Sequence, residues 1–159
     1  MAEKYGSKTH GNNSQKILVN GYYMMATEFF SANDYDNALL AFDSVLTLNP
    51  DHIASIYNKS LIYKNRDEAD LFEQTIDLFL SKLDPGKDAD KAEQAKGSAL
   101  EYFRAAGSKA NSANDLDEAL ALLNRAAKYG EDKILCYFFA DVYNKKNSFN
   151  EGAGYAQKG

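Results

Sequence analysis

The sequence predicts an all-α protein built from repeated antiparallel helix pairs, and three observations carry this prediction. Proline occurs only twice in 159 residues, which favours helices because proline removes a backbone hydrogen bond from a helix interior. Apolar residues recur at helical spacing along most of the chain. A polar turn motif, Asn-Asp-Tyr-Asp-Asn-Ala-Leu at residues 33–39, returns at 114–120 and in weaker form at 147–153. Recurrence of one helix start along a chain is typical of helical repeats.

The size and charge of the chain limit the functions that it can perform. A chain of 159 residues can bury a hydrophobic core unaided. Its formal net charge of −5 repels phosphate backbones, so we expect no nucleic-acid partner. No run approaches the roughly 18 apolar residues of a membrane span, so we expect no membrane insertion. Because residues 1–14 are polar, a cytoplasmic location is the default, and export or a periplasmic location stays open if a leader was removed.

The helical periodicity defines the elements in chain order. We expect a polar leader over residues 1–13 and a helical domain over 14–159. Helix starts are indicated by N-cap residues such as Asp34 and Asp115, each followed by an apolar helical pattern. The predicted helices are 14–31, 35–48, 52–65, 68–83, 89–112, 116–129, 132–146 and 149–157. Successive helices form about four pairs.

Alanines within the turn motifs give the repeat length. Ala153 follows Ala119 by 34 residues, and Ala119 follows Ala38 by 81, which is two periods of 34 plus 13 extra residues. The extra residues are expected as an insertion near 87–99, after a Pro-Gly turn. Asp88 is a good N-cap there, and helix-forming residues follow it. The insertion should lengthen the first helix of the third pair by about three turns.

Residues around these turns carry a family resemblance. The tetratricopeptide repeat has an aromatic residue, a Leu-Gly pair and a Tyr in its first helix, then Ala, Phe and Pro. The first copy is similar to this pattern at Tyr22, Met25, Ala26, Phe29, Ala38, Phe42 and Pro50. The third copy matches it at Phe103, Ala106, Gly107, Ala110, Ala119 and Leu123. The second copy keeps Ile56 and Tyr63, and the fourth keeps Tyr137, Ala140 and Ala153.

The resemblance implies a right-handed superhelix of antiparallel helix pairs, a tetratricopeptide-like α-solenoid. Its repeats would lie near 19–52, 53–86, 100–133 and 134–159. Small residues are expected where the helices of a pair cross closely, at Ala26, Ala38, Gly107 and Ala119. Large side chains are expected to fill the space beside them, at Tyr22, Phe29, Phe42, Ile56, Phe103, Leu123 and Tyr137.

The sequence offers no catalytic chemistry. No catalytic triad, metal-ligand set or phosphate-binding loop can be assembled from these residues, so we expect no enzyme activity, no cofactor and no metal ion. His10 and His52 have no plausible catalytic or ligating companion nearby in sequence, and both are expected to be solvated. Cys136 lies in an apolar helical stretch and is expected to be a small buried hydrophobe.

The resemblance therefore implies a protein-interaction scaffold. In this family the first helix of each pair lines a concave groove that binds a peptide or a helix. Aligned on the family pattern, the groove residues are Asn20, Tyr23, Met24, Thr27, Phe30, Tyr57, Asn58, Leu61, Lys64, Glu101, Arg104, Ala105, Ser108, Phe138, Phe139 and Val142. This set is unusually apolar and aromatic for an exposed wall. It favours a protein or peptide partner with an apolar or amphipathic segment.

Two alternatives to this ligand class were weighed. One subclass of the family binds acidic chaperone tails through a clamp of Lys, Asn and Arg residues, but only Asn58 matches the clamp, and Glu101 would repel the peptide carboxylate. The other alternative is a structural or assembly module, which would self-associate as a homo-oligomer or belong to a longer repeat array. The shortened fourth pair motivates it, because terminal repeats normally need a polar cap.

Overall fold

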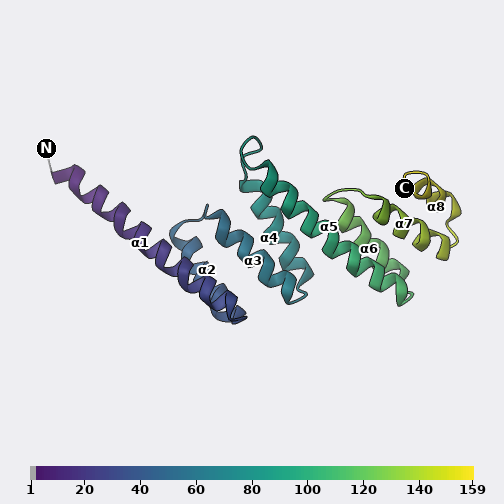
Figure 1. Ribbon diagram of the computed structural model, residues 1–159, viewed down its shortest axis with the longest axis horizontal. Coiled ribbons are helices and arrows are strands. Elements are labelled where there is room, and N and C mark those ends of the chain that lie inside the picture. Colours follow the sequence, from purple (N-terminus) through teal and green to yellow (C-terminus); the bar gives the residue numbers. More distant parts are fainter. Residues whose placement is uncertain (1–2) are drawn as a thin grey trace. The chain divides into compact units, whose positions relative to one another are not determined.

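The computed structural model describes the backbone of residues 3–159 and the side chains from residue 13 onward. This part of the chain is helical throughout, without strands (Figure 1), so the predicted all-α fold class is confirmed. The helices are α1 (Glu3–Ser31), α2 (Tyr35–Leu48), α3 (Ile53–Asn65), α4 (Ala69–Lys82), α5 (Ala89–Ser112), α6 (Leu116–Ala127), α7 (Lys133–Lys145) and α8 (Phe149–Ala156). None of these helices has the length and hydropathy needed to cross a membrane.

The helices pack as consecutive pairs within two compact units. The unit Met1–Leu83 contains the pairs α1–α2 and α3–α4, and the unit Asp84–Gly159 contains α5–α6 and α7–α8. Most helix bounds lie within two residues of those predicted. The exception is α1, which begins at Glu3 instead of residue 14 and so includes most of the predicted leader. Apolar periodicity cannot reveal such a polar extension of a helix. The prediction for His10 concerns a side chain outside the described residues.

One turn geometry joins the two helices of each described pair. In the first pair, Asn33 has left-handed backbone angles, and its N–H donates to the carbonyl of Phe30 at 3.0 Å. The next N–H, of Asp34, donates to the carbonyl of Phe29 at 2.9 Å, which completes a Schellman motif. Asp34 then caps α2 by accepting a hydrogen bond from the N–H of Asn37. The described residues with positive φ are Asn33, Asp67, Asn114 and Asn147, at 58°, 58°, 62° and 57°.

These turns define the repeat register. From residue 33 to 67, 67 to 114 and 114 to 147 the spacings are 34, 47 and 33 residues. The 47-residue spacing agrees with the 13-residue insertion, but the last spacing shows that the fourth pair is one residue shorter than predicted. We call residues equivalent when they stand at the same distance from the left-handed residue of their pair. By this measure Gly152, which is buried, is equivalent to Ala119, and the predicted equivalence of Ala153, which is exposed, is wrong.

The same shift changes which residues of α7 fill the core. Cys136, and not Tyr137, is equivalent to Ile56 of α3. Cys136 is 4% exposed and Tyr137 is 66% exposed, so the predicted burial of Cys136 is confirmed and the filler role of Tyr137 is wrong. Tyr22 holds the equivalent position in α1, yet it is 36% exposed, which also departs from its predicted filler role.

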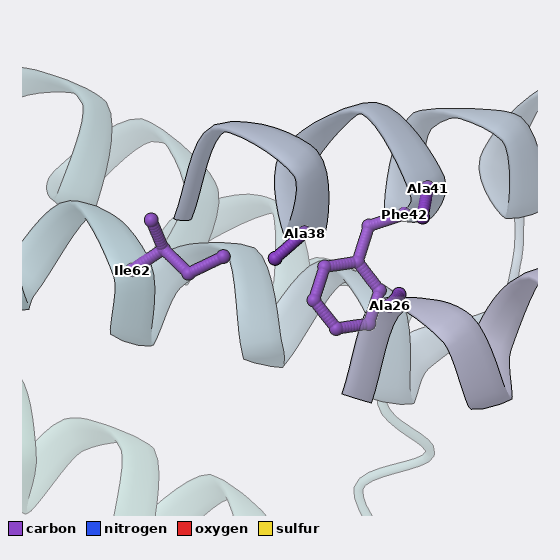
Figure 2. Close-up of a cluster of buried hydrophobic side chains, with 5 residues drawn as sticks. All are labelled: Ala26, Ala38, Ala41, Phe42 and Ile62. Carbon is purple, nitrogen blue, oxygen red and sulfur yellow. The ribbon is translucent and has the colours of Figure 1, made fainter. Parts of the chain in front are cut away.

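The core of the first unit follows the predicted division between small and large residues. Ala26 of α1 and Ala38 of α2 are fully buried, and the ring of Phe42 fills the space beside them (Figure 2). Ile62 of α3 belongs to the same cluster, so the core continues from the first helix pair into the second. Phe29 is half-buried against this cluster. The small residues allow α1 and α2 to approach closely while the larger ones bury apolar area.

The glycines of α5 test this packing. Gly107 is buried, and a methyl group there would lie 2.8 Å from Cδ2 and 2.9 Å from Cγ of Leu123. We expect Gly107→Ala to lower the free energy of unfolding, because overpacking costs about 1–3 kcal/mol and exceeds the roughly 0.5–1 kcal/mol that alanine gains in a helix. Gly97 has no neighbour within 4 Å. Gly97→Ala should therefore raise the free energy of unfolding by about 0.5–1 kcal/mol in urea titrations. Stabilisation by both changes would contradict close packing at Gly107.

Candidate functional site

In the first unit, the predicted groove residues lie on α1 and α3. Side-chain contacts join these two helices. The Nδ2 group of Asn58 on α3 donates a hydrogen bond to the hydroxyl of Tyr23 on α1 at 3.4 Å. The ring of Tyr23 also meets His52, at the start of α3, edge-on with 4.9 Å between ring centroids. We name as the α1–α3 wall the residues Asn20, Tyr23, Met24, Thr27, Phe30, Tyr57, Asn58, Leu61 and Lys64.

The α1–α3 wall combines exposed and half-buried side chains. Met24 is 63% exposed, and Asn20 is exposed as well, while the other members are half-buried. The two tyrosine rings are held from behind by core rings. Tyr23 lies 6.1 Å from Phe42, and Tyr57 lies 4.9 Å from Phe79, between ring centroids. These rings are therefore fixed before any ligand arrives, which lowers the conformational entropy that binding would cost.

An open cavity of ≈ 460 Å³ adjoins the wall at Asn20, where the turn between α2 and α3 lies against α1. The side-chain amide of Gln15 donates a hydrogen bond to the carbonyl of Leu48 at 2.6 Å and so ties that turn to α1. Apart from Lys16, the cavity is lined by uncharged or neutral side chains. Its lining residues are Gln15, Lys16, Val19, Asn20, Leu48, Asn49, Pro50 and His52. The cavity could accept a small group that extends from a ligand on the wall.

His52 has a structural role that the sequence did not reveal. It is the N-cap of α3, where its Nδ1 atom accepts a hydrogen bond from the N–H of Ser55 at 3.3 Å and lies 2.9 Å from the Ser55 hydroxyl. The ring is half-buried beside Tyr23, so the prediction of a solvated histidine is wrong. Burial disfavours the charged imidazolium and lowers the pKa of His52 below its ordinary value.

This shift predicts a pH dependence of stability. Because the pKa of His52 is lower in the folded protein than in the unfolded chain, its contribution to stability is present above about pH 6.5. It is lost as the pH falls through the lower folded-state pKa. Asparagine is also a good N-cap, so His52→Asn should keep the helix start and lose this dependence. Urea unfolding at pH 7.5 and 5.5 measures both proteins. The same loss of stability in both would contradict the assignment to His52.

In the second unit, the wall formed by α5 and α7 is polar and ion-paired. Arg104 of α5 forms an ion pair with Asp132, the N-cap of α7. Asn111 donates to the carboxylate of Asp141 at 2.7 Å, and the Lys145 ammonium donates to the Asn111 carbonyl at 2.9 Å. Hydrogen bonds from Asn111 and Lys145 lower the pKa of Asp141. Burial opposes ionisation of Asp132, but hydrogen bonds from the Leu135 N–H and from Arg104 lower its pKa overall. Both acids therefore stay ionised at neutral pH.

The predicted groove residues of the second unit are placed unevenly. Glu101 is exposed, and Arg104 and Phe138 are half-buried. Phe139 and Val142 are 1% and 0% exposed, so they belong to the core and offer no surface to a ligand. The cause is the shorter fourth pair, because a one-residue offset turns a helix by about 100°. The residues of α7 equivalent to Glu101, Arg104 and Ser108 are Ile134, Tyr137 and Asp141.

Sequence reasoning missed this set on α7, although a signal for it was present. Ile134 is 53% exposed and Tyr137 is 66% exposed, as expected for positions on the outer face. Counting between Asn114 and Asn147, the polar turn residues, gives a repeat of 33 residues and the correct face. Counting between alanines gives 34 and the wrong one, because alanine is tolerated on both buried and exposed helix faces.

Comparisons with known proteins return no matching family model and no matching curated protein. Solved structures similar to this chain include "MamA RS-1 ArsTM double mutant", at 17% identity and a TM-score of 0.46, covering 88% of this chain and 72% of that one. "MamA 41-end from Desulfovibrio magneticus RS-1" has 17% identity, a TM-score of 0.45 and the same coverage. "Crystal structure of MamA protein" has 14% identity, a TM-score of 0.39 and 89% coverage of both chains. Similarity at this level carries no argument about function.

Proposed function

We propose that this chain is a protein-interaction scaffold and that its α1–α3 wall binds an apolar or amphipathic peptide segment. The observation that carries the proposal is the exposure of Met24, at 63%, on the same wall as the half-buried side chains of Tyr23 and Leu61. An unbranched thioether side chain adapts to varied partners, and aromatic residues are frequent among binding hot spots. The proposed role is binding and requires no catalytic group, metal ion or cofactor.

Polar groups on the wall support an ordered mode of binding. Asn20 and Asn58 carry amides that can hydrogen-bond to the backbone of a peptide. The apolar side chains would then select which residues of the peptide face the wall. We extend the proposal to Glu101, Arg104 and Phe138 as candidate contacts on the second unit. Ion pairing of Arg104 with Asp132 makes that surface a weaker match for an apolar ligand.

The proposal is tested by selecting peptides from a random display library against the protein and measuring their affinity for variants. Met24→Asp should weaken the selected peptides by at least about tenfold, which is a loss of roughly 1.4 kcal/mol. Its melting temperature should stay close to that of the parent protein, because exposed substitutions change stability by about 0.5 kcal/mol or less.

The matched control is Leu40→Asp. Leu40 is 66% exposed on α2, so this variant adds the same charge to an equally exposed apolar position outside the wall. It should bind the selected peptides as tightly as the parent protein does. If Met24→Asp and Leu40→Asp bind equally well, the peptides do not use the α1–α3 wall.

A further inference from the structure

Self-association, the alternative role that the sequence leaves open, has a structural basis in the junctions between helix pairs. Each unit contains one such junction, and the two junctions share an ion pair at equivalent positions. Asp36 of α2 pairs with Arg66, the C-cap of α3, at 2.5 Å. Asp117 of α6 pairs with Lys146, the C-cap of α7. Successive pairs therefore stack with the same register in both units.

Each junction has a donor side, on the earlier pair, that reaches the first helix of the later pair. Tyr23 meets His52 in the first unit, and its equivalent Arg104 pairs with Asp132 in the second. Tyr35 adds a second donor contact in the first unit, because its hydroxyl accepts a hydrogen bond from Asn65 and the guanidinium of Arg66 lies over its ring. In the last pair, the equivalents of Tyr23 and Tyr35 are Tyr137 and Phe149. These two residues form what we name the donor face, and they are 66% and 62% exposed.

The receiving side of each junction is on the first helix of the later pair. In α3 it includes His52, the buried Ile56, and Lys59, which forms an ion pair with Asp43 of α2. The equivalent residues of α1 are Leu18, Tyr22 and Met25, which we name the receiving face. Their exposed fractions are 51%, 36% and 48%. Among the described residues, no helix pair packs on this side of α1.

The donor and receiving faces match each other in chemistry. The inner contact between Arg104 and Asp132 corresponds to Tyr137 meeting Leu18, and the inner ion pair of Asp117 with Lys146 corresponds to Asn150 meeting Ala32. At both contacts the charge is lost from the two sides together. Had only one side changed, stacking the faces would bury a charge without a partner, which is strongly unfavourable.

We propose that this protein assembles head to tail, with the donor face of one copy packed on the receiving face of a second copy. The interface would reproduce the inner junctions, with apolar contacts in place of ion pairs. Because the two surfaces differ, the contact is heterologous, and each added copy leaves one donor face and one receiving face free. Such an assembly grows into a ring or an open filament and does not stop at a symmetric dimer.

The experiment is sedimentation velocity on the full chain over a wide range of concentrations. The average mass of the parent protein should rise with concentration. Tyr22→Glu and Tyr137→Glu should each weaken self-association by at least about tenfold, because each places a charge in an apolar contact. Leu40→Glu is the matched control. Leu40 is 66% exposed, and its equivalents Gln74, Ala121 and Gly154 are exposed as well, so no junction uses this position.

Mixing the two variants distinguishes head-to-tail assembly from a symmetric contact. Tyr22→Glu keeps an intact donor face and Tyr137→Glu keeps an intact receiving face, so an equimolar mixture should form one-to-one dimers and nothing larger. Circular dichroism checks that both variants are folded. A parent protein that stays monomeric at every concentration overturns the proposal. So does a mixture of folded variants that stays monomeric, or a loss of assembly in Tyr22→Glu that is absent in Tyr137→Glu.

Discussion

Replacing Phe139 by alanine is expected to lower the free energy of unfolding by about 3–5 kcal/mol, the range for truncating a buried phenylalanine. The side chain is 1% exposed, and its ring stacks on Tyr155 with 4.4 Å between centroids. Tyr143 lies on the same ring at 6.4 Å. Removing the ring would leave a cavity in the last helix pair, where the short helix α8 depends on this contact.

The matched variant is Tyr137→Ala on the same helix. Tyr137 is 66% exposed, so its removal should change the free energy of unfolding by about 0.5 kcal/mol or less. Urea titrations of both variants, followed by circular dichroism, give the comparison. A larger loss for Tyr137→Ala than for Phe139→Ala would mean that α7 presents the face expected from a 34-residue repeat and that the structural register is wrong.

A second large effect is expected where the helices of a pair cross. Ala38 and Ala119 are equivalent, and both are fully buried. Leucine at either position should force the paired helices apart and cost about 1–3 kcal/mol through overpacking. For a chain of this length such a loss lowers the melting temperature by several degrees, at roughly 2–4 °C per kcal/mol.

The control for this pair is Ala153→Leu. Alanine at this position is exposed, so leucine there should leave the melting temperature nearly unchanged. The sequence alone treats Ala119 and Ala153 as the same position in successive repeats, whereas the structure separates them. Equal melting temperatures for Ala119→Leu and the parent protein would show that α5 and α6 do not cross closely at this residue.

Local signals were sufficient to predict much of the fold. The bounds of α2 and α5 agree with the predicted 35–48 and 89–112, because capping residues, turn residues and apolar periodicity all mark the same ends. The burial of Phe42 and Phe103 also followed from the repeat pattern. The start of α1 was missed, since its first turns are polar and contribute no periodic apolar signal.

The surface was harder to predict than the fold. One residue of offset in the fourth pair was enough to exchange the buried Phe139 with the exposed Tyr137. Contacts between pairs, such as Arg104 with Asp132, join residues 28 positions apart and depend on the packing of whole helices. The residues of α1 and α3 avoid the offset because their turn residues are 34 apart. Their role in peptide binding stays a prediction.

The methionine methyl resonances test the central claim most directly. Met24 belongs to the α1–α3 wall and its neighbour Met25 belongs to the receiving face, and the two are 63% and 48% exposed. The protein, labelled with ¹³C at the methionine methyl groups and diluted below the range of self-association, would be titrated with the tightest peptide from the display selection. The account predicts that the Met24 methyl signal moves to saturation while the Met25 signal stays in place. Binding of the peptide that moves Met25 alone, or that moves neither signal, would contradict it.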